Sequence, residues 1–203
     1  MEYTLHHGDL PDGLDLGAVV AVDGEMMGLN AWRDRLCMLQ FRGEHGDIHL
    51  VKFGRGEYHA PNIVKLFADD NVVKILHCAV TDMAFAYRWL GVRMQNVFCT
   101  KVASRIARTN TDMHSMKYLI KEYLEIEFKK THQTSDWGAE TYSPEQLEYA
   151  ASDVLHLHAL REKLMELLLR EGRAELAEAC FKFLPYRAVL DLNGWPEEGL
   201  LGY

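Results

Sequence analysis

The chain has 203 residues, of which 48% are hydrophobic and 26% are charged, and its formal net charge is −8. This size and composition are typical of an ordinary globular protein, and we expect a single domain over residues 1–203. The negative charge argues against a broad basic face that grips a long nucleic acid, but it permits a short nucleotide held through metal ions.

The sequence carries no evident signal for secretion or for a membrane span. Residues 1–9 lack a basic patch followed by an apolar run, and no window holds the roughly 18 consecutive apolar residues that a membrane helix needs. We therefore expect a cytoplasmic protein with no membrane partner. The four cysteines lie far apart without a CxxC pair, which favours reduced thiols over a disulfide or a zinc site.

The first strong strand pattern along the chain ends in two acids. The apolar run 18–22 indicates a strand buried on both faces of a covered sheet, and Asp23 and Glu25 follow it. Because strand side chains alternate, these two carboxylates share one face about 7 Å apart, with Gly24 between them. That spacing lets both converge on one cation. The alternative, of equal weight, is that the acids mark where the chain leaves the sheet for solvent.

The runs that follow complete a predicted sheet. Strand patterns cover residues 18–25, 36–41, 48–53, 72–77 and 97–99. A Gly-bounded turn at 43–46 predicts that the first three strands form an antiparallel meander. A helix opened by Pro61 separates the third strand from the fourth, which implies a right-handed crossover beside the first strand. The predicted fold is α/β, with a five-stranded mixed sheet flanked by helices.

Apolar residues at helical spacing predict the helices. These cover residues 61–67, 81–90, 101–107, 113–124, 144–170 and 174–183. Two start signals agree for the longest one, since Ser143 and Gln146 match a capping box and Pro144 occupies the first helical position. Gly172 is expected to end it.

Three polar groups stand out on these predicted helices. Asp82 lies in the first turn of its helix, where a carboxylate also stabilises the helix dipole. Tyr149 and Asp153 are four residues apart on the longest helix and so lie on one face, among small residues. Taken singly, each is better explained as a solvated acid, a dipole partner or a core tyrosine. Their occurrence together with Asp23 and Glu25 favours one shared site over these separate explanations.

Two segments predict contacts with other molecules. Residues 128–142 form a polar loop that contains Trp137, and such a loop often touches a ligand, although a tryptophan that fills a gap in the core is at least as common. Residues 181–203 are expected to end the last helix and form a tail rich in Leu, Phe and Tyr, too apolar to stay free in a monomer. We expect an oligomer interface there, covered by a neighbouring subunit.

Three of these segments together resemble the motifs of a known enzyme class. Residues 23–25, 77–82 and 149–153 are similar to the motifs of the DEDD 3′→5′ exonucleases, in the subgroup with tyrosine in the third motif. Residues 77–82, 135–137 and 148–153 resemble the ribonuclease D family, and the likeness covers nearly the whole chain. It implies a ribonuclease H-like fold and 3′→5′ exoribonuclease activity.

The resemblance also implies cofactors and a mechanism. Two divalent cations would bind between four carboxylates, those of Asp23, Glu25, Asp82 and Asp153. By the same likeness Asp23 bridges both ions, and the hydroxyl of Tyr149 aligns the attacking water of an in-line phosphodiester hydrolysis. An all-oxygen ligand set suits Mg²⁺ or Mn²⁺ better than zinc.

For the substrate, the likeness suggests a wedge, a ribose contact and a site for the 5′ end. Leu29 is placed to wedge against a terminal base, or it is a core leucine. His77 contacts the ribose, or it simply ends a strand. The candidates for the 5′ end are polar, basic or aromatic residues of the loop and of a short helix, namely Lys130, Gln133, Ser135, Trp137, Arg105 and Arg108.

Other segments resemble one particular group within the family. Residues 7–11, 98–104, 183–188 and 192–195 look like the compact nano-RNase group of oligoribonucleases. That likeness implies very short RNA as the substrate, dinucleotides first, degraded to nucleoside monophosphates. It also implies a ring-like homo-oligomer, an octamer.

Alternatives remain open on the sequence. A general ribonuclease D-like exonuclease for longer RNA shares these motifs, and so does a DNA proofreading exonuclease, which usually accompanies a polymerase domain. A non-catalytic RNA-binding module of the same fold would be expected to lose one of the four acids, and all four are present. The family usually has threonine where this chain has Gly24, and often where it has Met26; neither position supplies a carboxylate, so metal ligation should survive.

Overall fold

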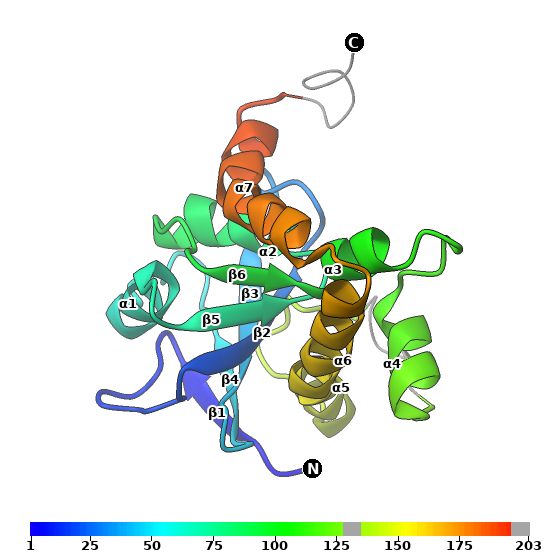
Figure 1. Ribbon diagram of the computed structural model, residues 1–203. Coiled ribbons are helices and arrows are strands. Elements are labelled where there is room, and N and C mark those ends of the chain that lie inside the picture. The colour runs from blue at the N-terminus through cyan, green and yellow to red at the C-terminus, as the bar shows by residue number, and fades with distance from the viewer. Residues whose placement is uncertain (128–134, 196–203) are drawn as a thin grey trace.

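The computed structural model describes residues 1–127 and 135–195 and shows an α/β fold in which helices cover both faces of one mixed sheet (Figure 1). The strands are β1 (Thr4–His7), β2 (Val19–Met26), β3 (Leu36–Arg42), β4 (Ile48–Lys52), β5 (Val73–Leu76) and β6 (Val97–Cys99). The helices are α1 (Pro61–Ala68), α2 (Val80–Phe85), the π-helical turn η1 (Ala86–Leu90), α3 (Thr100–Ala107), α4 (Met116–Leu124), α5 (Pro144–Leu155), α6 (Leu157–Arg170) and α7 (Ala174–Leu192). Within the described ranges, no helix is long and apolar enough to cross a membrane.

β2 lies inside the sheet, whose strand order is β1-β4-β3-β2-β5-β6. β2, β3 and β4 form the predicted antiparallel meander, and β5 runs parallel to β2, as the crossover predicts. The registers place Ala21 opposite Arg42 on one side and beside Ile75 on the other. Because both faces of the sheet are covered, Val20, Ala21 and Val22 are completely buried.

The prediction of five strands is wrong by one, because β1 also joins the sheet. β1 pairs in parallel with β4, with Leu5 beside Leu50, and His6 Nε2 lies 2.9 Å from His49 Nδ1. Most of β1 is exposed, so its sequence lacks the buried apolar run that marks the other strands. Pairing with a distant strand, rather than local pattern, makes this segment a strand.

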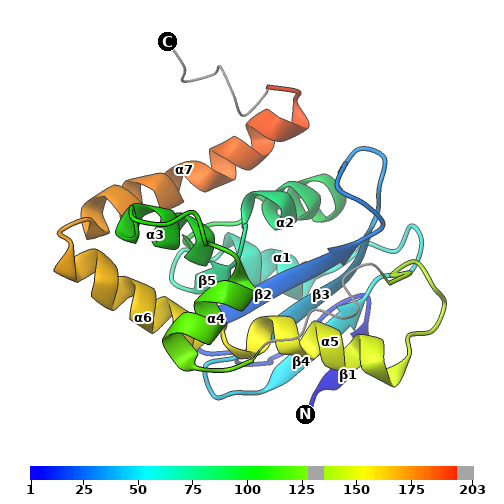
Figure 2. The same cartoon turned by 90° about the vertical axis from the view of Figure 1, so that its right-hand side faces the viewer.

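Two hydrophobic cores lie on opposite faces of the sheet, beneath the helices that Figure 2 shows on either side of it. One combines Val20 and Val22 with residues of α1, α2 and the second half of α7. The other combines Ala21 with residues of α3, α4, α5 and α6. Since side chains alternate along a strand, Asp23 and Glu25 share the face of Ala21. The acids of β2 therefore point toward the side that α5 covers.

The longest predicted helix is two helices in the structure. α5 ends at Leu155 and α6 begins at Leu157, with His156 between them at φ −105° and ψ 0°. The predicted capping box of Ser143 and Gln146 is present at the start of α5. The break directs α5 onto β2, β3 and β4, while α6 packs on α3, α4 and β5. No glycine or proline marks this break, so periodicity alone does not reveal it.

The last helix is longer than predicted. The sequence predicts an end at Phe183, but α7 continues through Pro185 to Leu192. A proline inside a helix removes a hydrogen bond and costs about 3 kcal/mol; burial of Leu184 and Leu192 in the core beside α2 offsets that loss. Much of the apolar sequence predicted as a tail is therefore covered within its own chain. Residues 196–203, the rest of that prediction, lie outside the described residues.

The helix predicted over residues 81–90 begins as α2 and ends as η1. Asp82 is in the first turn of α2, and Gly91 at φ 69° follows η1, as predicted. β5 leads into α2 through a turn that contains Cys78, a non-glycine residue at φ 61°. Because β5 is parallel to β2, this turn and the acids of β2 lie at the same edge of the sheet.

Candidate active site

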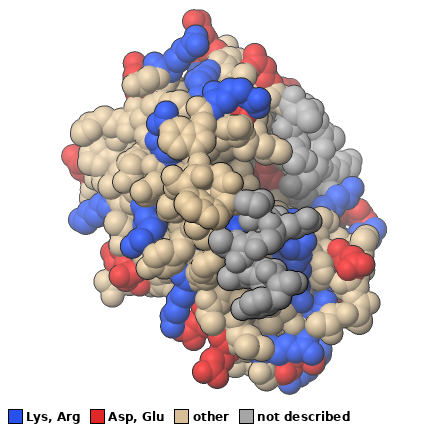
Figure 3. All heavy atoms as spheres, turned by 90° about the horizontal axis from the view of Figure 1, so that it is seen from above, with Lys and Arg blue, Asp and Glu red and all other residues tan. Residues whose placement is uncertain are grey.

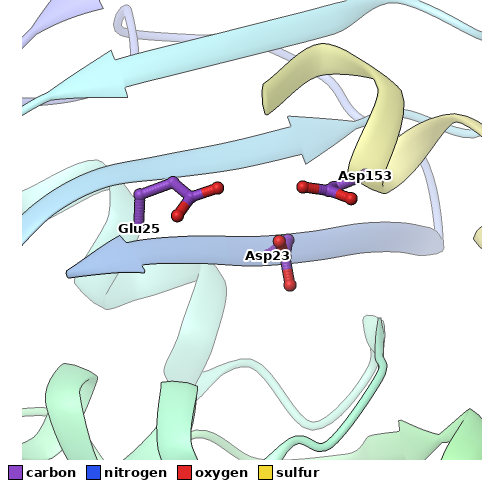
Figure 4. A group of neighbouring side chains, drawn as sticks. All are labelled: Asp23, Glu25 and Asp153. Atoms are coloured by element: carbon purple, nitrogen blue, oxygen red, sulfur yellow. The ribbon is translucent and has the colours of Figure 1, made fainter. Parts of the chain in front are cut away.

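Three carboxylates from two elements come together near the end of β2. Figure 4 shows Asp23 and Glu25 on β2 and Asp153 reaching toward them from α5. One ligand oxygen from each lies within 4.8 Å of the other two, and the described residues contain no second group of this kind. Glu25 is 8% exposed and Asp153 only 3%. Strand alternation and the packing of α5 on the sheet thus concentrate negative charge in a largely buried place.

The fourth predicted acid, Asp82, approaches the same strand from α2. It is buried and lies against Gly24, since a β-carbon at position 24 would come 2.9 Å from Asp82 Oδ1. The missing side chain of Gly24 therefore leaves room for this carboxylate. Burial, together with the negative charge of Asp153, raises the pKa of Asp82, because both disfavour its charged form.

Tyr149 lies one turn before Asp153 on α5, and both side chains line the same cavity. Burial and the nearby carboxylates of Asp153 and Glu25 raise the pKa of the Tyr149 hydroxyl. The hydroxyl therefore keeps its proton at neutral pH, so it can donate a hydrogen bond to a neighbouring carboxylate. Its oxygen lone pairs can still accept a hydrogen bond from a water beside the carboxylates.

This set of side chains fits divalent metal ions. The ligand atoms are carboxylate oxygens, which suit Mg²⁺ and Mn²⁺, and no His or Cys belongs to the group. Carboxylates this close repel one another, and a bound cation reverses that repulsion. Asp23 itself is half-buried, while Glu25 and Asp153 are buried, so a bound ion would be held at the inner wall of the site.

One cavity of about 550 Å³ contains these groups. Apart from Arg105 and Arg108, every predicted site residue in the described part of the chain lines it: Asp23, Glu25, Leu29, His77, Asp82, Ser135, Trp137, Tyr149 and Asp153. Lys130 and Gln133, predicted for the 5′ end, lie outside the described residues. The predicted acids and the predicted substrate contacts therefore share one space.

The structure decides between the alternatives for Leu29 and Trp137. Leu29 is 86% exposed while lining the cavity, so it is not a core leucine. Trp137 is 2% exposed and packs against Tyr142 and Tyr149, with ring centroids 5.6 and 6.2 Å away. Trp137 therefore fills a gap in the core and also forms part of the cavity wall.

The two arginines considered for the 5′ end lie elsewhere. The Arg108 guanidinium donates to Glu122 at 2.5 Å and to the carbonyl of Met113 at 2.8 Å. Arg105 is exposed on α3. Neither lines the cavity, because Arg108 is used to tie α3 to α4 and Arg105 faces solvent.

The cavity wall also includes residues outside the set predicted from sequence. They come from β2 and the turn after it, from the β5–α2 turn, from α2 and from α4: Met26, Met27, Gly28, Cys78, Thr81 and Met116. Most lie within or beside the motif segments, and that position is a signal by which they could be found. Met116 is far from every motif and reaches the cavity only because α4 packs on α6.

The fold and the site match a known family. The family model described as 3′-5′ exonuclease matches residues 9–169, which is most of the chain. The chain therefore belongs to the 3′-5′ exonuclease family. The predicted α/β, ribonuclease H-like fold is confirmed, with six strands instead of five.

Individual relatives narrow the comparison. Ribonuclease D of Gluconacetobacter diazotrophicus is 31% identical over 156 residues, which make up 77% of this chain and 39% of that protein. The chain spans about two fifths of the length of the curated ribonuclease D relatives it matches. Two structures of Brucella melitensis NrnC, one with bound Mg²⁺ and one bound to pGG, are each 44% identical with a TM-score of 0.95, and the likeness covers 100% of both chains. The predicted likeness to ribonuclease D and to the nano-RNase group is thus confirmed.

Proposed function

We propose that this protein is a metal-dependent 3′→5′ exoribonuclease that degrades very short RNA, dinucleotides first, to nucleoside monophosphates. The observation that carries the proposal is the single cavity in which four carboxylates and the Tyr149 hydroxyl face the predicted substrate contacts. The pGG bound to NrnC, which is 44% identical to this chain, supports a dinucleotide as the ligand of that cavity.

In the proposed reaction, Asp23, Glu25, Asp82 and Asp153 would hold two Mg²⁺ or Mn²⁺ ions. Such ions would supply a nucleophile from water at neutral pH and stabilise charge on the attacking and leaving oxygens. Tyr149 donates to Asp153 and accepts a hydrogen bond from the attacking water, which keeps that water in line with the scissile bond. Water adds its oxygen to phosphorus and the 3′ oxygen leaves with a proton, so the products are a 5′-monophosphate and a new 3′ hydroxyl.

Charge and cavity size support the preference for short RNA. The chain has a net charge of −8, and on the face seen in Figure 3 the described Lys and Arg residues are scattered among acidic and uncharged ones. Counterion release along a row of phosphates then adds little affinity. The cavity of about 550 Å³ is the size of a small-ligand site, roughly 300–1,000 Å³. We propose that Leu29 wedges against the 3′ base and that the loop around Trp137 caps the 5′ end.

The proposed assembly is a homo-oligomer, and the likeness to the nano-RNase group suggests an octamer. Large aromatic side chains remain exposed around the end of α7, with Phe183 at 38%, Tyr186 at 52% and Trp195 at 50%. Trp32, 60% exposed, joins this surface through a hydrogen bond from its Nε1 to the carbonyl of Leu192. Exposed aromatic residues in such number favour a surface that a second subunit covers.

A panel of 5′-labelled RNAs from two to about seven nucleotides, with Mg²⁺, Mn²⁺ or EDTA, tests the function. We expect the highest kcat/KM for the 5′-phosphorylated dinucleotide and a lower kcat/KM when its 5′-phosphate is removed. In EDTA we expect no activity. Equal or rising kcat/KM with length would instead identify a general ribonuclease D-like exonuclease. Binding without cleavage at any length would identify a non-catalytic RNA-binding module.

A further inference from the structure

His77 is held at the cavity wall by a residue of another element. It directly follows β5, which runs parallel to β2, the strand that carries Asp23. His77 lines the cavity that contains the acids. Its ring nitrogen Nδ1 lies 2.9 Å from the hydroxyl oxygen of Thr100, the first residue of α3.

The Thr100 hydroxyl has a single proton, and the Leu76 carbonyl is placed to accept it in a hydrogen bond. The hydroxyl donates to the carbonyl oxygen of Leu76 at 3.2 Å. Toward His77 it is therefore left to accept, so Nδ1 carries the proton of that hydrogen bond. Thr100 is completely buried, and water does not compete for either bond.

A neutral imidazole with its proton on Nδ1 can only accept a hydrogen bond at Nε2. A phosphate oxygen has no proton to offer such an atom, whereas a ribose hydroxyl has one. We propose that Thr100 is a positioning residue, which fixes His77 in the Nδ1-protonated tautomer so that Nε2 accepts a hydrogen bond from a ribose hydroxyl of the bound RNA. This inference rests on the proposed function, to which it adds how the site distinguishes a substrate with that hydroxyl from one without it.

Nitrogen-15 NMR of the histidine-labelled protein tests the tautomer without substrate. The His77→Gln variant identifies the His77 signals by their absence. We expect a protonated Nδ1 and an unprotonated Nε2 in the wild type and in Thr100→Ser, which keeps the hydroxyl. In Thr100→Val, which keeps the shape but loses the hydroxyl, the Nε2-protonated tautomer should appear. A wild-type His77 protonated at Nε2, alone or together with Nδ1, would overturn the inference.

Kinetics with matched substrates test the ribose contact. The substrates are a 5′-phosphorylated diribonucleotide and analogues that lack either one 2′-hydroxyl or the 3′-hydroxyl. An analogue without the bound hydroxyl leaves His77 Nε2 without a hydrogen-bond donor. We therefore expect the kcat/KM of the wild type to be about tenfold lower for one analogue than for the diribonucleotide. Thr100→Val should lower kcat/KM for the diribonucleotide about tenfold and leave that analogue unaffected, and Thr100→Ser should behave like the wild type. The analogue that shows this pattern identifies the hydroxyl.

Other outcomes separate the two proposals. If Thr100→Val lowered kcat/KM equally for all substrates, Thr100 would have only a structural role. A wild type that cleaves every analogue equally well would overturn the inference even if Thr100→Val did not fold. A wild type that cleaves no dinucleotide would overturn the proposed function, and the NMR experiment would still decide the tautomer.

Discussion

Tyr149 and Asp153 lie one turn apart on α5, and both side chains line the cavity that contains the acids. The hydroxyl therefore reaches the acid cluster from the same helix that supplies one of its members. Because both residues belong to one helix, their spacing is set by helix geometry and not by the surrounding loops. Any change in the position of α5 moves the two groups together.

Replacing Tyr149 by phenylalanine removes only the hydroxyl of that pair. We expect kcat to fall about 10²-fold, the usual scale for a group that positions the nucleophile, while dinucleotide affinity and thermal stability change little. Single-turnover kinetics and a binding titration measure the two effects. Tyr58→Phe is the control, because its hydroxyl donates to the Leu36 carbonyl away from the cavity. An unchanged rate for Tyr149→Phe would assign this tyrosine to the core alone.

Asp153→Asn should abolish turnover without harming the fold. The variant loses one ligand of the proposed ions, and it also removes a negative charge from a group of three carboxylates within 4.8 Å of one another. In EDTA its melting temperature should therefore equal or exceed that of the wild type, since repulsion is relieved. Calorimetric titration should show weaker Mg²⁺ binding. A clearly lower melting temperature in EDTA would mean that Asp153 is a structural residue.

The metal-free protein should become less stable as the pH rises. Burial and Asp153 raise the pKa of Asp82 to about 8 from an ordinary 3.8. Between these values the folded chain holds a proton on Asp82 that the unfolded chain releases. The stability that Asp82 contributes is therefore full below about pH 4 and is lost as the pH rises through about 8. Thermal melts in EDTA should show this slope, and Asp82→Asn should flatten it. Mg²⁺ should stabilise the wild type more near pH 8 than near pH 5.

Leu29→Ala should affect the substrate and not the fold. Its side chain is 86% exposed, so truncation leaves no internal cavity. If it wedges against a base, losing that apolar contact should lower dinucleotide kcat/KM about tenfold. Leu169→Ala, another exposed leucine on α6 at 65%, is the matched control. Equal kcat/KM for both variants would remove Leu29 from the list of substrate contacts.

The exposed aromatic residues of α7 test the proposed assembly. We expect the double variant Phe183→Ser, Tyr186→Ser to sediment as a smaller species than the wild type at micromolar concentration, because both side chains are exposed in the single chain. Its far-UV circular dichroism should be unchanged. Leu169→Ser should keep the wild-type assembly. A wild type that sediments as a monomer would contradict the oligomer.

Some features were predictable because they depend on short-range geometry. Alternation along a strand places Asp23 and Glu25 on one face, and a spacing of four residues places Tyr149 above Asp153. The capping box at Ser143 is likewise a contact between near neighbours. Each of these needs only the chain's own periodicity, so the members of the acid cluster could be named before their meeting point was known.

Tertiary structure alone decided the features that depend on distant partners. β1 becomes a strand by pairing with β4, and α7 continues through Pro185 because its later residues are buried against α2. Likewise, Thr100 meets His77 only because β6 lies beside β5 and leads directly into α3. The sequence by itself determined which residues are candidates for the chemistry and on which face of their own element they lie. Packing between distant segments, whose burial outweighs local preferences, decided which of them share a cavity and which groups position them.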